Sequence, residues 1–183
     1  MFDSKRLFVG LDLPMSLQAE LAALDPAMPG LRWLPAGQMH LSLSFQDKVN
    51  EEGQARLQEA LAKVKVPPFV LPVEGMDAFR SRGKLSVVWA GVGGGHPHLF
   101  LLHRRVQDAV LAAGLEPDLR PFKPHVTLAR TRTLSRQVLQ PFLRRYAEAE
   151  FGMMRVEHFT LYSSELEAEG AVHQVEMRVE LVG

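Results

Sequence analysis

The sequence has no cysteine, no long apolar run and no excess of either charge. Without cysteine, the chain can form no disulfide bond, no thiolate nucleophile and no cysteine-ligated zinc site. Its 21 basic and 21 acidic residues give a formal net charge of zero at pH 7. Because proteins that coat long nucleic acids usually carry a large basic excess, any contact with nucleic acid should be local, at an end or a single phosphate.

The apolar segments are short. The first of them, residues 7–11, is soon followed by Asp12 and Pro14, so it is shorter than the core of a secretory signal or a membrane span. We therefore expect a soluble, cytoplasmic protein that does not contact a membrane. With 183 residues, 46% of them hydrophobic, the chain can form one large domain or two small, closely packed lobes.

Strands and helices are expected to alternate along the chain. Periodicity and turn residues predict strands over 5–12, 38–46, 69–79, 85–92 and 122–129, and near 151–163 and 171–181. They predict helices after Pro14, after residue 50, over 97–113 and over 135–149. No linker divides the pattern, so the sequence predicts an α+β fold of two similar lobes that share one core.

Two short segments, one in each half of the chain, follow the same pattern. Residues 40–43 read His-Leu-Ser-Leu and residues 125–128 read His-Val-Thr-Leu. Because a strand alternates its side chains between two faces, each segment should place its histidine and its hydroxyl on one face. Two such strands facing one cleft would offer two imidazoles and two hydroxyls to one substrate.

This set of side chains suits the cleavage of a phosphate ester. A nucleophile must lose a proton and the leaving oxygen must gain one, and near neutral pH two imidazoles can perform both transfers. The hydroxyls of Ser42 and Thr127 would then hold the non-bridging oxygens of the phosphate. A single segment of this kind arises by chance and usually contains a structural histidine. Its repetition in both halves favours the catalytic interpretation.

Several further segments accompany the two motifs: residues 6–14 (RLFVGLDLP), 32–35 (RWLP), 87–92 (VVWAGV), 120–130 (RPFKPHVTLAR) and 161–166 (LYSSEL). With them the chain resembles the two-histidine (2H) phosphoesterase superfamily. Within that superfamily it is most similar to the bacterial and archaeal RNA 2′,3′-cyclic phosphodiesterases, also called 2′-5′ RNA ligases. The family often has an aromatic residue where His173 stands here, and a Leu-Gly pair at residues 46–47.

The resemblance implies a single domain, residues 1–183, with a bilobed α+β fold and a pseudo-twofold repeat. Two antiparallel sheets would line a central cleft, with helices on the outside. It implies hydrolysis of an RNA 2′,3′-cyclic phosphate to a 2′-phosphate without metal or other cofactor, and 2′-5′ ligation in reverse. By match of motif, His40 is the general acid that protonates the departing 3′ oxygen and His125 is the general base that activates water. The sequence alone does not fix this order.

Four further residues are candidates for binding the substrate, an RNA that ends in a cyclic phosphate. The family places an arginine just after the second motif, as Arg130 stands here, and Lys123 adds positive charge nearby. Strict alternation would point Arg130 away from the cleft, so the strand must twist or end before it. Phe45 and Phe122 flank the motifs, where their rings would either stack on a base or belong to the core.

Nothing in the sequence suggests an obligate oligomer, so we expect a monomer. Three alternative functions stay open. The same chemistry could act on small cyclic nucleotides, or the chain could be a non-catalytic module that binds RNA ends. A histidine-ligated metalloenzyme is the third. His96, His98 and His103 lack the spacing of helical metal ligands, so we expect no metal site there.

Overall fold

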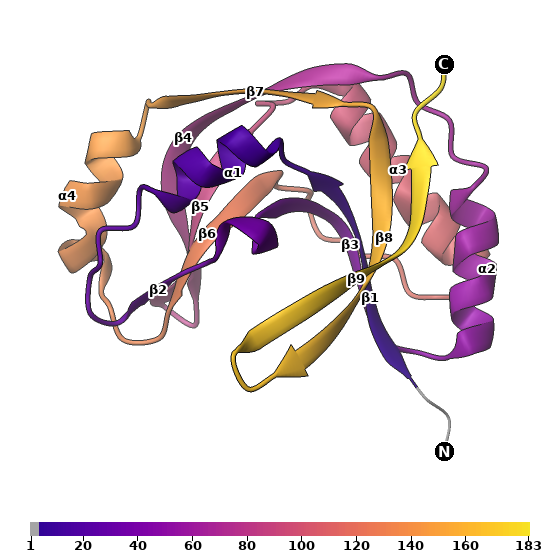
Figure 1. Cartoon of the computed structure of the whole chain (residues 1–183), viewed down its shortest axis with the longest axis horizontal. Coiled ribbons are helices and arrows are strands. Elements are labelled where there is room, and N and C mark those ends of the chain that lie inside the picture. Colours follow the sequence, from indigo (N-terminus) through magenta and orange to yellow (C-terminus); the bar gives the residue numbers. More distant parts are fainter. Residues whose placement is uncertain (1–3) are drawn as a thin grey trace.

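The computed structural model describes residues 4–183 and has a mixed α/β fold built on a strongly curved antiparallel sheet (Figure 1). The strands are β1 (Lys5–Asp12), β2 (Leu31–Trp33), β3 (His40–Val49), β4 (Phe69–Ser81), β5 (Lys84–Val92), β6 (His125–Thr131), β7 (Glu150–Val156), β8 (His158–Glu167) and β9 (Gly170–Glu180). The helices are α1 (Met15–Ala22), α2 (Glu51–Leu61), α3 (Pro97–Ala112) and α4 (Arg136–Tyr146), with a short 3₁₀ helix, η1 (Ala36–Gln38).

The strands follow one hydrogen-bonded path, β7-β4-β5-β6-β3-β1-β8-β9, and β2 pairs with β6 beside it. The expectation of two separate sheets therefore needs correction, because β3 and β6 pair with each other at Leu41 and Val126. Pairing satisfies backbone groups that two exposed strand edges would leave open at the centre of the molecule. The two predicted motif strands are thus direct neighbours.

Helices α2, α3 and α4 lie on the outside of the curved sheet (Figure 1), and most of their regularly spaced apolar residues face the core. On α2 and α3, which pack together, Leu57, Leu61, Leu99 and Leu102 are fully buried. On α4 the helical spacing of apolar residues predicts that Val138 faces the core, and this prediction is wrong, because Val138 is 52% exposed. Ser135 caps this helix by accepting a hydrogen bond from the Val138 amide, which fixes Val138 in the exposed first turn.

The chain crosses the molecule where the sequence predicts one strand over 151–163. β7 ends at Val156 and pairs with β4, whereas β8 begins at His158 and pairs with β1, near the opposite end of the strand order. β8 and β9 then form a long hairpin that projects from the body of the protein (Figure 1). Across residues 4–183, none of the helices has the length and apolar character needed to cross a membrane.

Candidate active site

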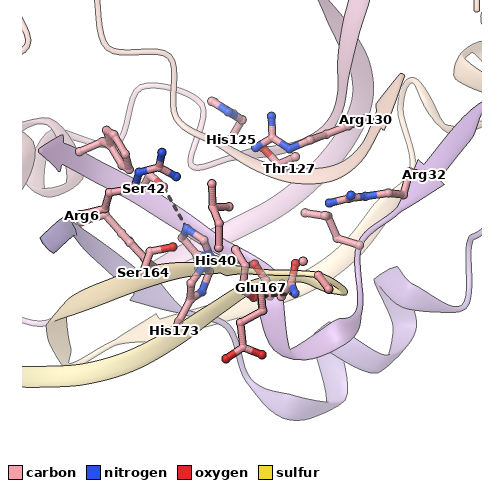
Figure 2. Close-up of a pocket in the computed structure, with 18 residues that line it drawn as sticks. Arg6, Arg32, His40, Ser42, His125, Thr127, Arg130, Ser164, Glu167 and His173 are labelled. Carbon is pink, nitrogen blue, oxygen red and sulfur yellow. Dashed lines mark hydrogen bonds between the residues drawn. The ribbon is translucent and has the colours of Figure 1, made fainter. Parts of the chain in front are cut away.

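The pairing of β3 with β6 brings the two motifs together. Leu41 lies opposite Val126, and both side chains are fully buried. The antiparallel register of β3 and β6 places His40 next to Thr127 and Ser42 next to His125. These four side chains lie on the face of the sheet opposite to the buried Leu41 and Val126. All four of these side chains line one cavity of about 560 Å³ (Figure 2).

Each histidine is oriented by the backbone two residues before it. The Nδ1–H of His40 donates to the carbonyl oxygen of Gln38 at 2.8 Å, and that of His125 donates to the carbonyl of Lys123 at 2.6 Å. Because a carbonyl only accepts, both protons must lie on Nδ1, which leaves Nε2 as the acceptor in each neutral ring. The Ser42 hydroxyl donates to Nε2 of His40 at 3.0 Å.

The two rings lie in different surroundings. His40 stacks on the buried ring of Phe8 with centroids 4.6 Å apart, and His173 approaches its edge at 5.5 Å. This burial lowers the pKa of His40 to about 4. His125 has Phe79 edge-on at 4.8 Å, and burial lowers the pKa of His125 as well. At neutral pH both imidazoles are therefore uncharged in the empty cavity.

A β-bulge explains how Arg130 reaches the cavity. Thr127 and Ala129 of β6 pair with successive residues of β5, so Leu128 is an extra residue between them. The extra residue shifts the alternation of side chains by one position, and Arg130 turns to the face that carries the motif. Arg130 lines the cavity, and its charge contributes to lowering the pKa of both motif histidines.

The first motif strand has the same irregularity at the same place. Ser42 and Ser44 of β3 pair with successive residues of β1, which leaves Leu43 as the extra residue. The shift turns Phe45 into the cavity, where it is 57% exposed. Phe45 and Arg130 therefore occupy corresponding positions, three residues after the hydroxyl of each motif.

The structure does not bring two predicted substrate contacts into this cavity. Phe122 stacks on His103 with centroids 3.9 Å apart, and with Lys123 it lines a separate cavity beside β5. Lys123 contributes its carbonyl to the orientation of His125, not its ammonium group to the cavity. The physical reason is the strand start: residues before His125 are not yet part of β6, so alternation does not govern their direction.

The cavity also contains residues that sequence reasoning missed as site residues. They include Arg6, Phe8, Arg32, Gln38, Ser164, Glu167 and His173. The tip of the β8–β9 hairpin forms one wall, and the Gln38 side chain holds it by donating from Nε2 to the carbonyl of Ala171 at 3.0 Å. Residues 6–14, 32–35 and 161–166 and the position of His173, all mentioned above for the resemblance, gave a signal for some of them.

The histidines near the start of α3 have another explanation. His96 caps the helix by accepting a hydrogen bond from the amide of His98 at 3.2 Å. In the part of the chain that the structure describes, no three histidine, aspartate or glutamate side chains converge as metal ligands. The main cavity is lined mostly by imidazoles, hydroxyls and guanidinium groups, with Glu167 as its carboxylate.

The fold matches that of a solved phosphoesterase, with a TM-score of 0.79, 24% identity and coverage of 99% of this chain and 100% of the other. A family model described as the 2′-5′ RNA ligase superfamily matches residues 13–167. The chain therefore belongs to the 2′-5′ RNA ligase superfamily. The prediction of an enzyme of this family is confirmed.

Several named relatives are similar over nearly the whole chain. The RNA 2′,3′-cyclic phosphodiesterase of Archaeoglobus fulgidus is 31% identical over 172 residues, which are 92% of this chain and 96% of that protein. The protein of the same name in Escherichia coli is 29% identical, with coverage of 90% and 89%. The structure of E. coli LigT complexed with 3′-AMP has a TM-score of 0.80 and 26% identity, and the match covers 99% and 100% of the two chains.

Proposed function

We propose that this enzyme opens the 2′,3′-cyclic phosphate at the end of an RNA to give a 2′-phosphate, without a metal ion, and that it can join 2′-5′ ends in the reverse direction. The observation that carries the proposal is the placement of His40 and His125 on adjacent strands, in one cavity. Each ring is held through Nδ1, which leaves Nε2 for proton transfer, and in His40 this atom already accepts a hydrogen bond from the Ser42 hydroxyl. The names of the relatives support RNA as the substrate.

The reaction needs two proton transfers, one at each histidine. Nε2 of His125 takes a proton from water as the water oxygen bonds to phosphorus. The bond from phosphorus to the 3′ oxygen breaks, and Nε2–H of His40 gives its proton to that oxygen. The hydroxyls of Ser42 and Thr127 position the non-bridging oxygens. The products are a 2′-phosphate and a 3′-hydroxyl.

The acid role of His40 requires the substrate to change its protonation. With a pKa of about 4, the ring is neutral in the empty site at neutral pH. A phosphate anion against the ring favours the charged form and raises this pKa. The Ser42 hydroxyl, which now donates to Nε2, would turn to the phosphate when Nε2 gains its proton. The substrate thus creates the acid that cleaves it.

A pH profile tests this protonation argument. The pH dependence of kcat/KM reports the free enzyme, in which burial lowers both histidine pKa values. We therefore expect a bell-shaped curve for kcat/KM with its maximum below pH 6.5. The curve for kcat reports the complex and should lie at higher pH. Coincident curves for the two constants would contradict a substrate-induced rise in pKa.

Product analysis tests the reaction itself. The enzyme is incubated with chelator and an RNA oligonucleotide that ends in a 2′,3′-cyclic phosphate. A 2′-phosphate supports the proposal. A 3′-phosphate would reverse the assigned leaving group, and loss of activity in chelator would contradict metal independence. No product at all would favour a module that only binds RNA ends.

We also propose that the chain acts as a monomer in the cytoplasm and as a single domain of two lobes related by an approximate twofold repeat. The corresponding bulges at Leu43 and Leu128 support the repeat, because each follows the hydroxyl residue of its motif. Light scattering on the purified protein tests the monomer. A stable dimer would contradict it.

A further inference from the structure

A carboxylate lies beside the first motif histidine, on the neighbouring strand. Asp12 of β1 pairs in register with His40 of β3. Residues directly opposite each other on antiparallel strands point to the same face, with Cβ atoms about 5 Å apart. Asp12 does not line the main cavity, so it can act on a bound substrate only through another residue.

Three donors of β8 hold this carboxylate in place. The Thr160 hydroxyl and Nε2 of His158 both donate to Oδ2 at 3.2 Å, and the Tyr162 hydroxyl donates to Oδ1. Arg178 of β9 lies in register with Thr160 and adds a cation on the same face. Because an ionised carboxylate only accepts hydrogen bonds, three donors suit it well. Asp12 is thus a fixed negative charge, one strand away from the motif histidine.

Three charged or titratable groups act on His40 from the surrounding strands: Asp12 of β1, His173 of β9 and Arg130 of β6. Burial has the largest influence and lowers the pKa of His40, and the positive charges of His173 and Arg130 act in the same direction. Among these three groups, only Asp12 favours the protonated ring and raises the pKa.

His125 has a different partner across the sheet. On β5 it lies opposite Gly91, which has no side chain. Burial lowers the pKa of His125 and the charge of Arg130 lowers it further, while no carboxylate among residues 4–183 opposes them. A general acid must hold its proton at a pH at which the general base has lost its own. The charge on the neighbouring strand therefore distinguishes the two imidazoles.

We propose that Asp12 is a positioning residue that makes His40, rather than His125, the general acid, because its negative charge stabilises the imidazolium of His40. The inference rests on the proposed function and assigns the acid role within it. The proton passes from Nε2 of His40 to the 3′ oxygen as the bond between that oxygen and phosphorus breaks. Asp12 itself neither gains nor loses a proton.

Asp12→Asn tests the role of the charge, because it keeps the shape of the side chain. Without the carboxylate, less of His40 is protonated in the substrate complex. On the alkaline side of the pH profile, kcat should therefore fall by about threefold, the size expected for one opposite-charge pair across two strands. On the acid side kcat should be unchanged, because His40 is protonated with or without Asp12. KM should change little. Steady-state assays on an RNA that ends in a 2′,3′-cyclic phosphate measure both constants.

Two control variants separate the charge from the support of the fold. Asp77→Asn is the matched control, because Asp77 is also a paired carboxylate of the sheet, 3.1 Å from Arg136, and does not line the main cavity. Tyr162→Phe removes one hydrogen bond to Asp12 but keeps its charge. Both should leave the shape of the pH profile unchanged. An equal loss at all pH values in Asp12→Asn would overturn the proposal, and so would an unchanged profile or the same change in Tyr162→Phe.

An NMR titration gives a readout that does not need turnover. In enzyme saturated with inorganic phosphate, the pKa of His40 should be lower in Asp12→Asn than in the wild type, and that of His125 should stay the same. Equal His40 values in the two proteins would overturn the proposal. If the wild type converts no cyclic phosphate, the proposed function fails, whereas this titration still decides whether Asp12 stabilises protonated His40.

Discussion

The two motif strands have the same backbone geometry but place their histidines in different surroundings. Both rings are held through Nδ1 by a carbonyl two residues earlier, and both strands have a bulge after the hydroxyl. His40, however, is stacked on Phe8 and accepts a hydrogen bond from Ser42, whereas His125 has Phe79 edge-on. The backbone thus fixes where each imidazole lies, while the neighbouring rings set how easily it takes a proton.

This comparison teaches how a repeated motif can serve two roles. Two identical imidazoles in identical surroundings would titrate alike, and an acid and a base must differ at the same pH. Here the aromatic packing around His40 is contributed by β1 and β9, and that around His125 by β4 and β5. Substituting the residues that differ between the two motifs, one at a time, tests how the acid and base roles are divided between the two histidines.

The largest effect is expected from removing an imidazole. His40→Gln and His125→Gln should each lower kcat by about 10²–10⁴, because each removes one of the two proton-transfer groups of the proposed mechanism. The double variant should lose little more than either single variant, since the two act as a unit. Single-turnover assays measure this. His103→Gln, outside the cavity, is the control and should retain activity. Full activity in either motif variant would contradict the proposed mechanism.

The stability of the fold should depend on pH because burial lowers the pKa of His40. His40 has a folded-state pKa of about 4 and an unfolded value near 6.5. As the pH falls, the unfolded chain binds the proton before the folded chain does. The contribution of neutral His40 to the free energy of unfolding is therefore full above pH 6.5 and is lost between pH 6.5 and pH 4. Its size is up to about 3 kcal/mol. Urea unfolding across this range should show a shallower pH dependence in His40→Gln than in the wild type. Parallel curves would contradict the burial argument.

Removing the motif hydroxyls should have a smaller effect on the rate than removing the imidazoles, and the effect should differ between the two motifs. Ser42→Ala and Thr127→Ala should each lower kcat/KM by about tenfold, the value of one hydrogen bond to a charged group. Only Ser42→Ala should also shift the pH profile, because the Ser42 hydroxyl donates to Nε2 of His40. Thr127→Ser should restore the rate. A shift of equal size in both alanine variants would show that the two halves are electrostatically equivalent.

The smallest effect concerns the support beneath His40. Tyr162 stacks on the other face of Phe8, with centroids 5.0 Å apart, and its hydroxyl donates to Asp12. Tyr162→Phe removes that hydrogen bond and should lower the free energy of unfolding by about 1 kcal/mol. The reduction in kcat/KM should be smaller than in Ser42→Ala. Denaturant titration and steady-state assays measure the two quantities, and a larger catalytic loss would assign Tyr162 a direct role in positioning His40.

The sequence predicted most of what depends on local pattern. The two motif strands and the helices after residues 50 and 96 lie where periodicity and capping residues placed them, because those signals involve neighbouring residues. It could not predict what depends on pairing between distant segments. The joining of the halves into one sheet, the short strand β2 and the break between Val156 and His158 all follow from which strands meet.

The site shows the same division. Alternation correctly placed each histidine and hydroxyl on one face, but it predicted that Arg130 points away from the cleft. In the structure, the bulge at Leu128 reverses the alternation of side chains after that residue. A bulge is a property of a strand and its partner, so one strand's sequence does not reveal it. Phe122 lies outside the main cavity for a related reason, because it precedes the strand β6 and its ring packs against His103.

The pairing of Leu41 with Val126 has a consequence for how such an enzyme can change. Within residues 4–183 this pair is the whole ladder between β3 and β6. We therefore expect the distance between the imidazoles to depend on how the two strands pack, and the side chains of Leu41, Leu43, Val126 and Leu128 are buried beneath them. Exchanging one aliphatic residue for another below this point would widen or narrow the gap while every polar group stayed in place. Substitutions in the hydrophobic core can thus change which substrates fit between the two imidazoles.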